Sequence, residues 1–227
     1  MNVQLIEKSN LSDKANVIDE QRLLLPSHYS WQQFLGLEMW LADTSGLRIT
    51  YLDGNIELMT LGETHEGIKS ILRFLLEVYF VEKRIRFFPV GSATRRDEAK
   101  DVSFEPDESY YLGEKKSYPD LAIEIIVTSG NLNKLEKYSR FAIPEVWFWQ
   151  NNQLFLYYWQ ESGYVQIYRS ELLPDLDVDL LLKCLQIPDI LEARLELLKG
   201  ISQSESRRSG LTGHKQQETT QRNSPPP

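Results

Sequence analysis

The chain has 227 residues, 41% of them hydrophobic and 11% aromatic, which is enough apolar material for one substantial core. Its formal charge of -8 argues against a protein that holds nucleic acid by general electrostatic attraction, because that mode needs a basic surface. It does not exclude an enzyme that reaches a phosphate through bound divalent cations. The single cysteine, Cys184, can form no internal disulfide. Without a signal peptide or a run of about 18 apolar residues, we expect a soluble, cytoplasmic protein.

We expect one folded domain over residues 21–200, between two less structured ends. Residues 1–20 are polar and mixed in character, which indicates a flexible N-terminal arm. Residues 201–227 contain few large apolar side chains and end in three prolines. Such a segment cannot bury enough surface to fold, so a disordered C-terminal tail is predicted.

The first half of the domain is predicted to hold a helix, a hairpin and a long second helix. Apolar residues at helical spacing follow Ser30, a residue type that caps helix N-termini. Asp53–Gly54 joins two alternating runs within residues 48–59 and is a strong hairpin signal. Residues 64–84 carry an apolar stripe behind Thr64, a candidate N-cap, and so predict an amphipathic helix.

The second half alternates strands and helices. Extended segments are predicted within residues 86–96, 102–112 and 118–128, followed by a helix within 131–143 that stops before Pro144. Residues 145–170 read as three strands, with turns at 151–152 and 162–163, and a final helical region breaks at Pro188. This order predicts a mixed α/β domain around a central sheet.

Two carboxylates stand out in the apolar strand "SYPDLAIEIIVTSG", Asp120 and Glu124. A buried charge costs several kcal/mol unless it is paired, hydrogen-bonded or bound to metal, so both need an explanation. They share a face of the strand, but four extended residues span about 13 Å, too far for one metal ion to contact both.

Asp107 is a better partner for Glu124. The two are 17 residues apart, which leaves room for a strand, a turn at residues 113–116 and a returning strand. Adjacent strands lie about 4.8 Å apart, so opposed carboxylates can reach one divalent cation. We therefore predict that Asp107 and Glu124 meet across the sheet.

Four further polar residues are candidates for the same site. Glu57 points away from the face of Ile56, and the alternative is an exposed glutamate. His65 is predicted on the inward side of the long helix, and the alternative is a histidine that caps the helix or lies at the edge of the core. Lys134 and Tyr138 form an i,i+4 pair in the helix after the Glu124 strand. A lysine there could stabilise charge or orient a water; the alternatives are a solvated side chain or a role taken by Lys137.

With these residues in view, the chain resembles the Uma2 (DUF820) family of endonucleases, which belongs to the restriction-endonuclease-like PD-(D/E)XK superfamily. The resemblance covers about residues 21–182 and is carried by "GNIELMTLGETHE", "FEPDESYY" and "PDLAIEIIVTSGNLNKLEKYSRFAIPEVWFW". It implies an α/β, mixed α+β fold with a restriction-endonuclease-like core. In that core a central mixed β-sheet is flanked by helices and accompanied by an additional N-terminal helix and hairpin.

The resemblance also implies roles for individual residues. It makes Asp107 and Glu124 the metal-binding catalytic acids, with Glu57 as a further ligand. It places His65 beside them and the lysine of the "KLxxY" pattern at Lys134. Asp120 becomes a further ligand, a supporting residue or a strand cap, and Tyr138 a supporting residue; for Asp120 the spacing favours the last two roles.

The sequence departs from the superfamily pattern at Ile126. The E-x-K motif places a lysine two residues after the glutamate, and here that position is apolar. A lysine at position 134 would have to enter the site from the next helix.

These inferences predict a Mg²⁺- or Mn²⁺-dependent endonuclease that hydrolyses phosphodiester bonds in DNA and pairs as a homodimer, with no organic cofactor and no membrane association. The alternative is an inactive nuclease fold that serves as a binding or interaction module. Its partner surface would include the aromatic hairpin residues Tyr157, Tyr158, Tyr164 and Tyr168, which equally fit a sheet core.

Overall fold

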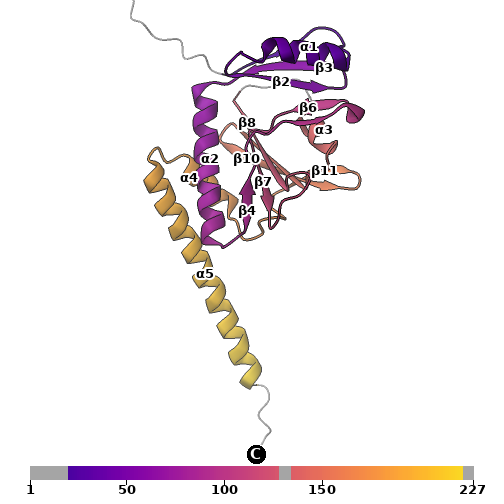
Figure 1. Cartoon of the computed structure of the whole chain (residues 1–227). Helices are drawn as coiled ribbons and strands as arrows, with labels where there is room; N and C mark the ends of the chain where they lie inside the picture. The colour runs from indigo at the N-terminus through magenta and orange to yellow at the C-terminus, as the bar shows by residue number, and fades with distance from the viewer. Residues whose placement is uncertain (1–19, 128–133, 222–227) are drawn as a thin grey trace, which may run out of the picture.

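The structure is a computed structural model that describes residues 20–127 and 134–221, with side chains described up to residue 206. It is a mixed α+β fold, as predicted, and its described part has five α-helices and two β-sheets where one central sheet was expected (Figure 1). The helices are α1 (Trp31–Leu41), α2 (Glu63–Glu82), α3 (Lys134–Ser139), α4 (Val178–Leu185) and α5 (Ile190–Gln221), and a short 3₁₀ turn, η1, covers Glu98–Lys100.

The first sheet has the strand order β1-β3-β2-β6-β5. Its strands are β1 (Gln21–Leu24), β2 (Leu47–Leu52), β3 (Asn55–Thr60), β5 (Arg95–Asp97) and β6 (Val102–Phe104), and every neighbouring pair is antiparallel. Asp53 and Gly54 both have positive φ, 46° and 78°, so the predicted β2–β3 hairpin is confirmed. A Cβ at Gly54 would also meet the His28 ring at 2.1 Å, so the turn requires glycine.

The second sheet has the strand order β11-β10-β9-β8-β7-β4. Its strands are β4 (Phe87–Pro89), β7 (Glu108–Leu112), β8 (Leu121–Ile126), β9 (Glu145–Gln150), β10 (Gln153–Gln160) and β11 (Gly163–Ile167). β8 lies inside the sheet, antiparallel to β7 and parallel to β9, and all six of its residues are buried. The "LAIEII" strand therefore has no solvent-facing side, and Glu124 is a core residue.

Alternation along β8 sends its side chains to two different cores. Ile123 and Ile125 pack with α2, α4 and α5, which cover one face of the second sheet. Ala122 and Ile126 pack on the other face, against α3 and strand β6 of the first sheet. Figure 1 shows the first sheet and α1 above the second sheet, with α2 running along the side of both. Glu124 shares the face of Ala122 and Ile126, so it points toward α3.

Two helix boundaries differ from the sequence-based expectation. α2 begins at Glu63 with Gly62 as its N-cap, so Thr64 is within the first turn and does not cap it. α5 continues to Gln221, whereas a disordered tail was predicted from residue 201. Buried Ile201 extends the apolar side of α5 past that boundary, and the helix carries on from it into the polar sequence. Residues 1–19 of the predicted arm and residues 222–227 lie outside the described residues, whereas Glu20, the last residue of that arm, is buried.

Other predicted features are present. Ser30 caps α1 in a reciprocal capping box with Gln33. Asn151 and Asn152, both at positive φ, form the β9–β10 turn, and the break between α4 and α5 contains Pro188. Cys184 is fully buried in the apolar core under α4, which raises the pKa of its thiol. None of the described helices has the length and apolar character that a membrane span requires.

Candidate active site

Asp107 and Glu124 lie opposite each other on neighbouring strands, as the spacing predicted. Glu108 at the start of β7 pairs with Ile123 of β8, which places Asp107 beside Glu124. The Asp107 amide donates to the Ile123 carbonyl at 3.1 Å, and the Ile125 amide donates to Asp107 Oδ2 at 2.6 Å. Both carboxylates are buried, with exposures of 1% and 3%. The β7–β8 ladder thus holds two acids side by side in the core.

The Asp107 carboxylate is surrounded by positive charge. Arg48 donates to its Oδ1, and His65 Nε2 lies 3.2 Å from its Oδ2. Burial alone would raise the pKa of Asp107, but His65, Arg48 and the Ile125 amide outweigh it and hold the pKa well below its usual value. Asp107 is therefore an anion at any physiological pH.

Glu124 is held from α3. Lys137 Nζ lies 2.5 Å from Glu124 Oε1, and the Tyr138 hydroxyl donates to the same oxygen. Burial, followed by the nearby Glu124 charge, raises the pKa of Tyr138 well above its ordinary value. The tyrosine keeps its proton and acts as a neutral donor to the carboxylate.

The first sheet supplies most of the remaining charges. Arg22 on β1 and Arg48 on β2 are both registered with Met59 of β3, and Glu57 lies two residues before Met59, so all share one face. Arg22 links Glu20 at 2.6 Å and Glu57 at 2.9 Å. Glu57 is buried, as it must be on this face, and the described contacts join it to an arginine rather than to Asp107.

His65 enters the cluster from the first turn of α2 and is fully buried. Its Nε2 also lies 3.8 Å from Glu20 Oε2, and its Nδ1 lies 3.2 Å from Glu66 Oε1. Burial lowers the pKa of His65, but the hydrogen bond and charge of Asp107 outweigh this and raise it. Position 65 is thus an inward-facing imidazole that contacts a candidate catalytic acid.

Lys134 lies in a different environment from Lys137. Its Nζ is buried and has no hydrogen-bond partner among the residues that the structure describes. Burial, followed by Arg22, lowers the pKa of Lys134 to about 8 against the opposing pull of Glu124. Lys134 and Ile126 line the same pocket. An amine from α3 therefore approaches Ile126, two residues after Glu124 on β8.

Asp120 lies away from this cluster, at the other end of β8. Its Oδ2 accepts from the Leu112 amide at 2.8 Å, and its Oδ1 accepts from Lys116 Nζ at 2.6 Å. The carboxylate thus fastens the turn between β7 and β8. Of the roles left open for Asp120, this geometry corresponds to the strand cap.

Several members of the cluster were not anticipated from the sequence. Arg22, Arg48 and Glu20 each have a side-chain exposure below 10%. The arginines carried a usable signal, because each stands at an inward position of an apolar strand, where an unpaired charge is costly. Glu20 carried none, since its place depends on β1 joining the first sheet.

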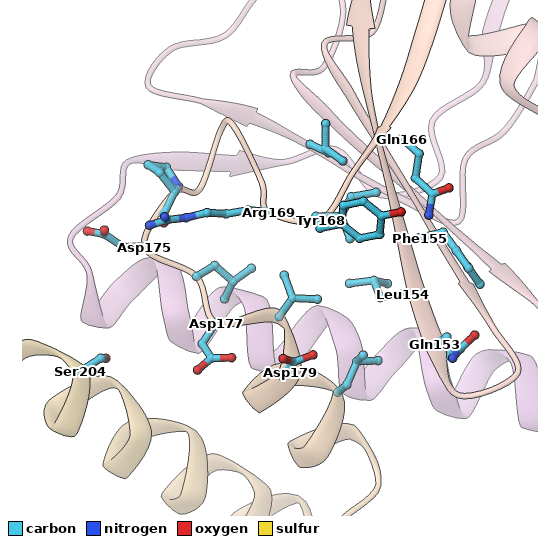
Figure 2. A pocket seen from close by; sticks show the side chains of 16 residues that line it. Gln153, Leu154, Phe155, Gln166, Tyr168, Arg169, Asp175, Asp177, Asp179 and Ser204 are labelled. Atoms are coloured by element: carbon cyan, nitrogen blue, oxygen red, sulfur yellow. The ribbon is translucent and has the colours of Figure 1, made fainter.

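A hollow of about 550 Å³ lies elsewhere, between β10, β11, α4 and α5. Figure 2 shows Tyr168 and Gln166 on its strand side and Asp177 and Asp179 on its helix side. Its polar groups serve local structure: Asp177 caps α4 through the Leu180 amide, and Arg169 donates to the Pro174 carbonyl. The buried charges at Asp107 and Glu124 thus mark a better candidate site than this hollow.

The donor types around Asp107 and Glu124 suit a hard divalent cation, because carboxylate oxygens are what Mg²⁺ and Mn²⁺ prefer. Within the described residues, no group of three or more His, Cys, Asp or Glu side chains is arranged so that it could hold a metal ion. Two carboxylates are nevertheless a usual protein contribution to a Mg²⁺ site, the rest being water and substrate phosphate.

Comparison with known proteins identifies the family of the chain. No curated protein matches the chain. The model of the Uma2 family, described as "Putative restriction endonuclease", matches residues 31–190, which include Glu57, His65, Asp107, Glu124 and Lys134. Since this match spans most of the sequence, the chain belongs to the Uma2 family.

Proposed function

We propose that the protein is a divalent-metal-dependent endonuclease that hydrolyses phosphodiester bonds in DNA, with its active site at Asp107 and Glu124. The observation that carries this proposal is the pair of buried carboxylates from Asp107, just before β7, and Glu124 of β8, with the buried amine of Lys134 approaching from α3. Membership of a family described as restriction endonucleases supports the reaction class and the substrate.

Asp107 and Glu124 would hold Mg²⁺ or Mn²⁺, with Glu57 the third candidate ligand. When bound, such an ion supplies an activated water and neutralises charge on the phosphate. This role requires ionised carboxylates, and the lowered pKa of Asp107 meets that requirement.

The polar side chains around the carboxylates would have two kinds of role in the reaction. Lys134, whose Nζ has no hydrogen-bond partner among the described residues, would neutralise the charge that develops on the phosphate or orient the attacking water. Lys137 and Tyr138 hold Glu124 in one orientation, and His65 does the same for Asp107. These three are positioning residues, because each reaches the reaction through a carboxylate.

The test is cleavage of supercoiled plasmid DNA by the purified protein, with Mg²⁺, with Mn²⁺ and with chelator. We expect nicking or linearisation only with metal, and a loss of at least about 100-fold in Asp107→Ala and in Glu124→Ala, because each removes a carboxylate whose oxygen donors the metal needs. Asp120→Asn is the matched control, since Asp120 is a carboxylate of the same strand region outside the cluster.

Circular dichroism checks that each variant is folded. Cleavage that survives in both alanine variants would place the active site elsewhere. Metal binding by the wild type without cleavage of any DNA would favour the alternative of an inactive nuclease fold that serves as a binding module.

A further inference from the structure

A second pocket, of about 350 Å³, lies next to the carboxylate pair on the α3 face of the second sheet. Its walls include Ile126 of β8, Phe148 and Gln150 of β9, Phe155 and Tyr157 of β10, and Lys134 of α3. The volume falls in the range of clefts that hold small ligands, roughly 300–1,000 Å³. Neither the carboxylates nor the motif residues of the proposed reaction explain the aromatic part of this pocket.

Strand register ties the pocket to the candidate active site. Glu124 of β8 is paired with Phe148 of β9, and Phe148 is paired with Phe155 of β10. These three side chains therefore form one row on the same face of the sheet. Adjacent strands are about 4.8 Å apart, so Phe148 is one strand away from Glu124 and Phe155 is two strands away. The aromatic side chains thus lie on the strands next to the one that carries Glu124.

The chemistry of the walls is that of a base-binding site. Phe155 and Tyr157 are partly exposed, so ring surface is available, and Tyr157 is held by an edge contact with Phe148 at 5.6 Å between ring centroids. Gln150, also partly exposed, has an amide that can both donate to and accept from the edge of a base. Aromatic surfaces of this kind stack with any base of a single strand.

Lys134 gives the pocket a positive charge that is complementary to a phosphate group. Its side chain lines the pocket, and its Nζ has no hydrogen-bond partner among described residues, while the other lysine of α3, Lys137, is paired with Glu124. A cation beside an aromatic pocket matches a nucleotide, which has an anionic phosphate next to a flat apolar base. A peptide of apolar side chains would leave this amine without a partner.

We propose that this pocket receives one unstacked nucleobase of the DNA strand whose phosphate is bound at Asp107 and Glu124. The substrate would then be DNA with an unpaired or readily opened position, and Tyr157, Phe155 and Gln150 would select it. This inference rests on the proposed function for the identity of the strand, but the pocket itself is defined independently of catalysis.

The experiment measures binding separately from cleavage. Duplexes of one sequence, either fully paired or with a three-nucleotide bubble that contains 2-aminopurine, are titrated with protein in Ca²⁺, and affinity and 2-aminopurine emission are recorded. We expect the wild type to bind the bubble about tenfold more tightly, which corresponds to about 1.4 kcal/mol, and to change the emission. Tyr157→Leu should lose most of both effects.

Tyr158→Leu is the matched control, because Tyr158 is the next residue of β10 and points to the opposite face. Phe155→Leu and Gln150→Leu provide second and third tests in case Tyr157→Leu folds poorly. Equal affinity of the wild type for both duplexes, or equal losses in Tyr157→Leu and Tyr158→Leu, would overturn the base pocket.

Plasmid cleavage in Mg²⁺, measured on the same preparations, separates the two proposals. A wild type that cuts DNA but shows no preference for the bubble overturns the pocket and leaves the nuclease intact. A wild type that prefers the bubble through Tyr157 but cuts nothing overturns the nuclease and supports the pocket as a base-binding site.

Discussion

At the scale of single residues, the two lysines of α3 show how position decides chemistry. Lys137 has an exposure of 8% and is paired with Glu124, whereas Lys134 has a buried Nζ without a partner among described residues. A buried ammonium that is not paired costs stability, and such groups are concentrated at functional sites. We interpret Lys134 as a residue that the protein maintains for activity at the expense of stability.

This interpretation predicts that Lys134→Met is more stable than the wild type at pH 7. The pKa of Lys134 is lowered from 10.5 to about 8 in the folded state, so between these values the unfolded chain binds more protons and the free energy of unfolding rises with pH. Removing the amine should raise the free energy of unfolding by on the order of 1–3 kcal/mol at pH 7. This gain should shrink above pH 8 and vanish above about pH 10.5.

Denaturant unfolding of both proteins from pH 7 to pH 10.5 measures the difference. Lys137→Met is the control and should be destabilised, because it leaves the buried Glu124 carboxylate without its lysine. A Lys134→Met protein less stable than the wild type at pH 7 would mean that the amine is paired in solution.

At the scale of elements, the β7–β8 hairpin has one end at the candidate active site and one end at the turn, each with its own carboxylates. Asp107 and Glu124 lie at the first end, and Asp120 holds the Leu112 amide and Lys116 at the second. The turn end keeps the register of the ladder, and the register keeps Asp107 opposite Glu124. Asp120 therefore supports the site without touching it.

We predict that Asp120→Ala lowers stability by about 1–2 kcal/mol, because it leaves the partly buried Leu112 amide without its acceptor. Asp120→Asn should lose less, because its carbonyl oxygen can still accept from the Leu112 amide. Thermal unfolding measures both losses, and plasmid cleavage well below the unfolding temperature should remain within about threefold of wild type. A loss of cleavage as large as in Glu124→Ala, in folded protein, would instead make Asp120 a metal ligand.

At the scale of the whole molecule, an acidic protein contains a cluster in which buried carboxylates lie among basic side chains. The net charge is -8, yet four carboxylates, from Glu20, Glu57, Asp107 and Glu124, share the cluster with Arg22, Arg48, Lys134 and Lys137. The carboxylate pair comes from the second sheet and the two arginines come from the first. Packing of the two sheets therefore brings the cluster together.

If this cluster binds a divalent cation, the ion should stabilise the folded molecule. Mn²⁺ at a concentration of 100 times its Kd should raise the free energy of unfolding by about 2.7 kcal/mol. For a chain of this size, that corresponds to a rise in Tm of roughly 5–10 °C. Thermal unfolding of the wild type with and without Mn²⁺ tests this. The shift should be lost in Glu124→Gln and kept in Asp120→Asn, and a shift of equal size in Glu124→Gln would locate the ion elsewhere.

The sequence by itself determined the local elements and the pairing of Asp107 with Glu124 across the sheet. Asp53–Gly54, Ser30 and the apolar periodicities act over a few residues, and the 17-residue separation of Asp107 and Glu124 with a turn between them left one plausible pairing. These features depend on turn geometry and side-chain alternation, which are properties of short segments.

Only the tertiary structure decided which charges meet. Arg22, Arg48 and Glu57 are 50 to 85 residues from Asp107 in the chain, and they join the same buried cluster because the first sheet packs across the second. The different environments of Lys134 and Lys137 depend on how α3 lies over β8, and the aromatic pocket depends on the alignment of three strands. Such contacts join segments that are distant in sequence, and the burial that sets their charge energies exists only once the sheets are packed together.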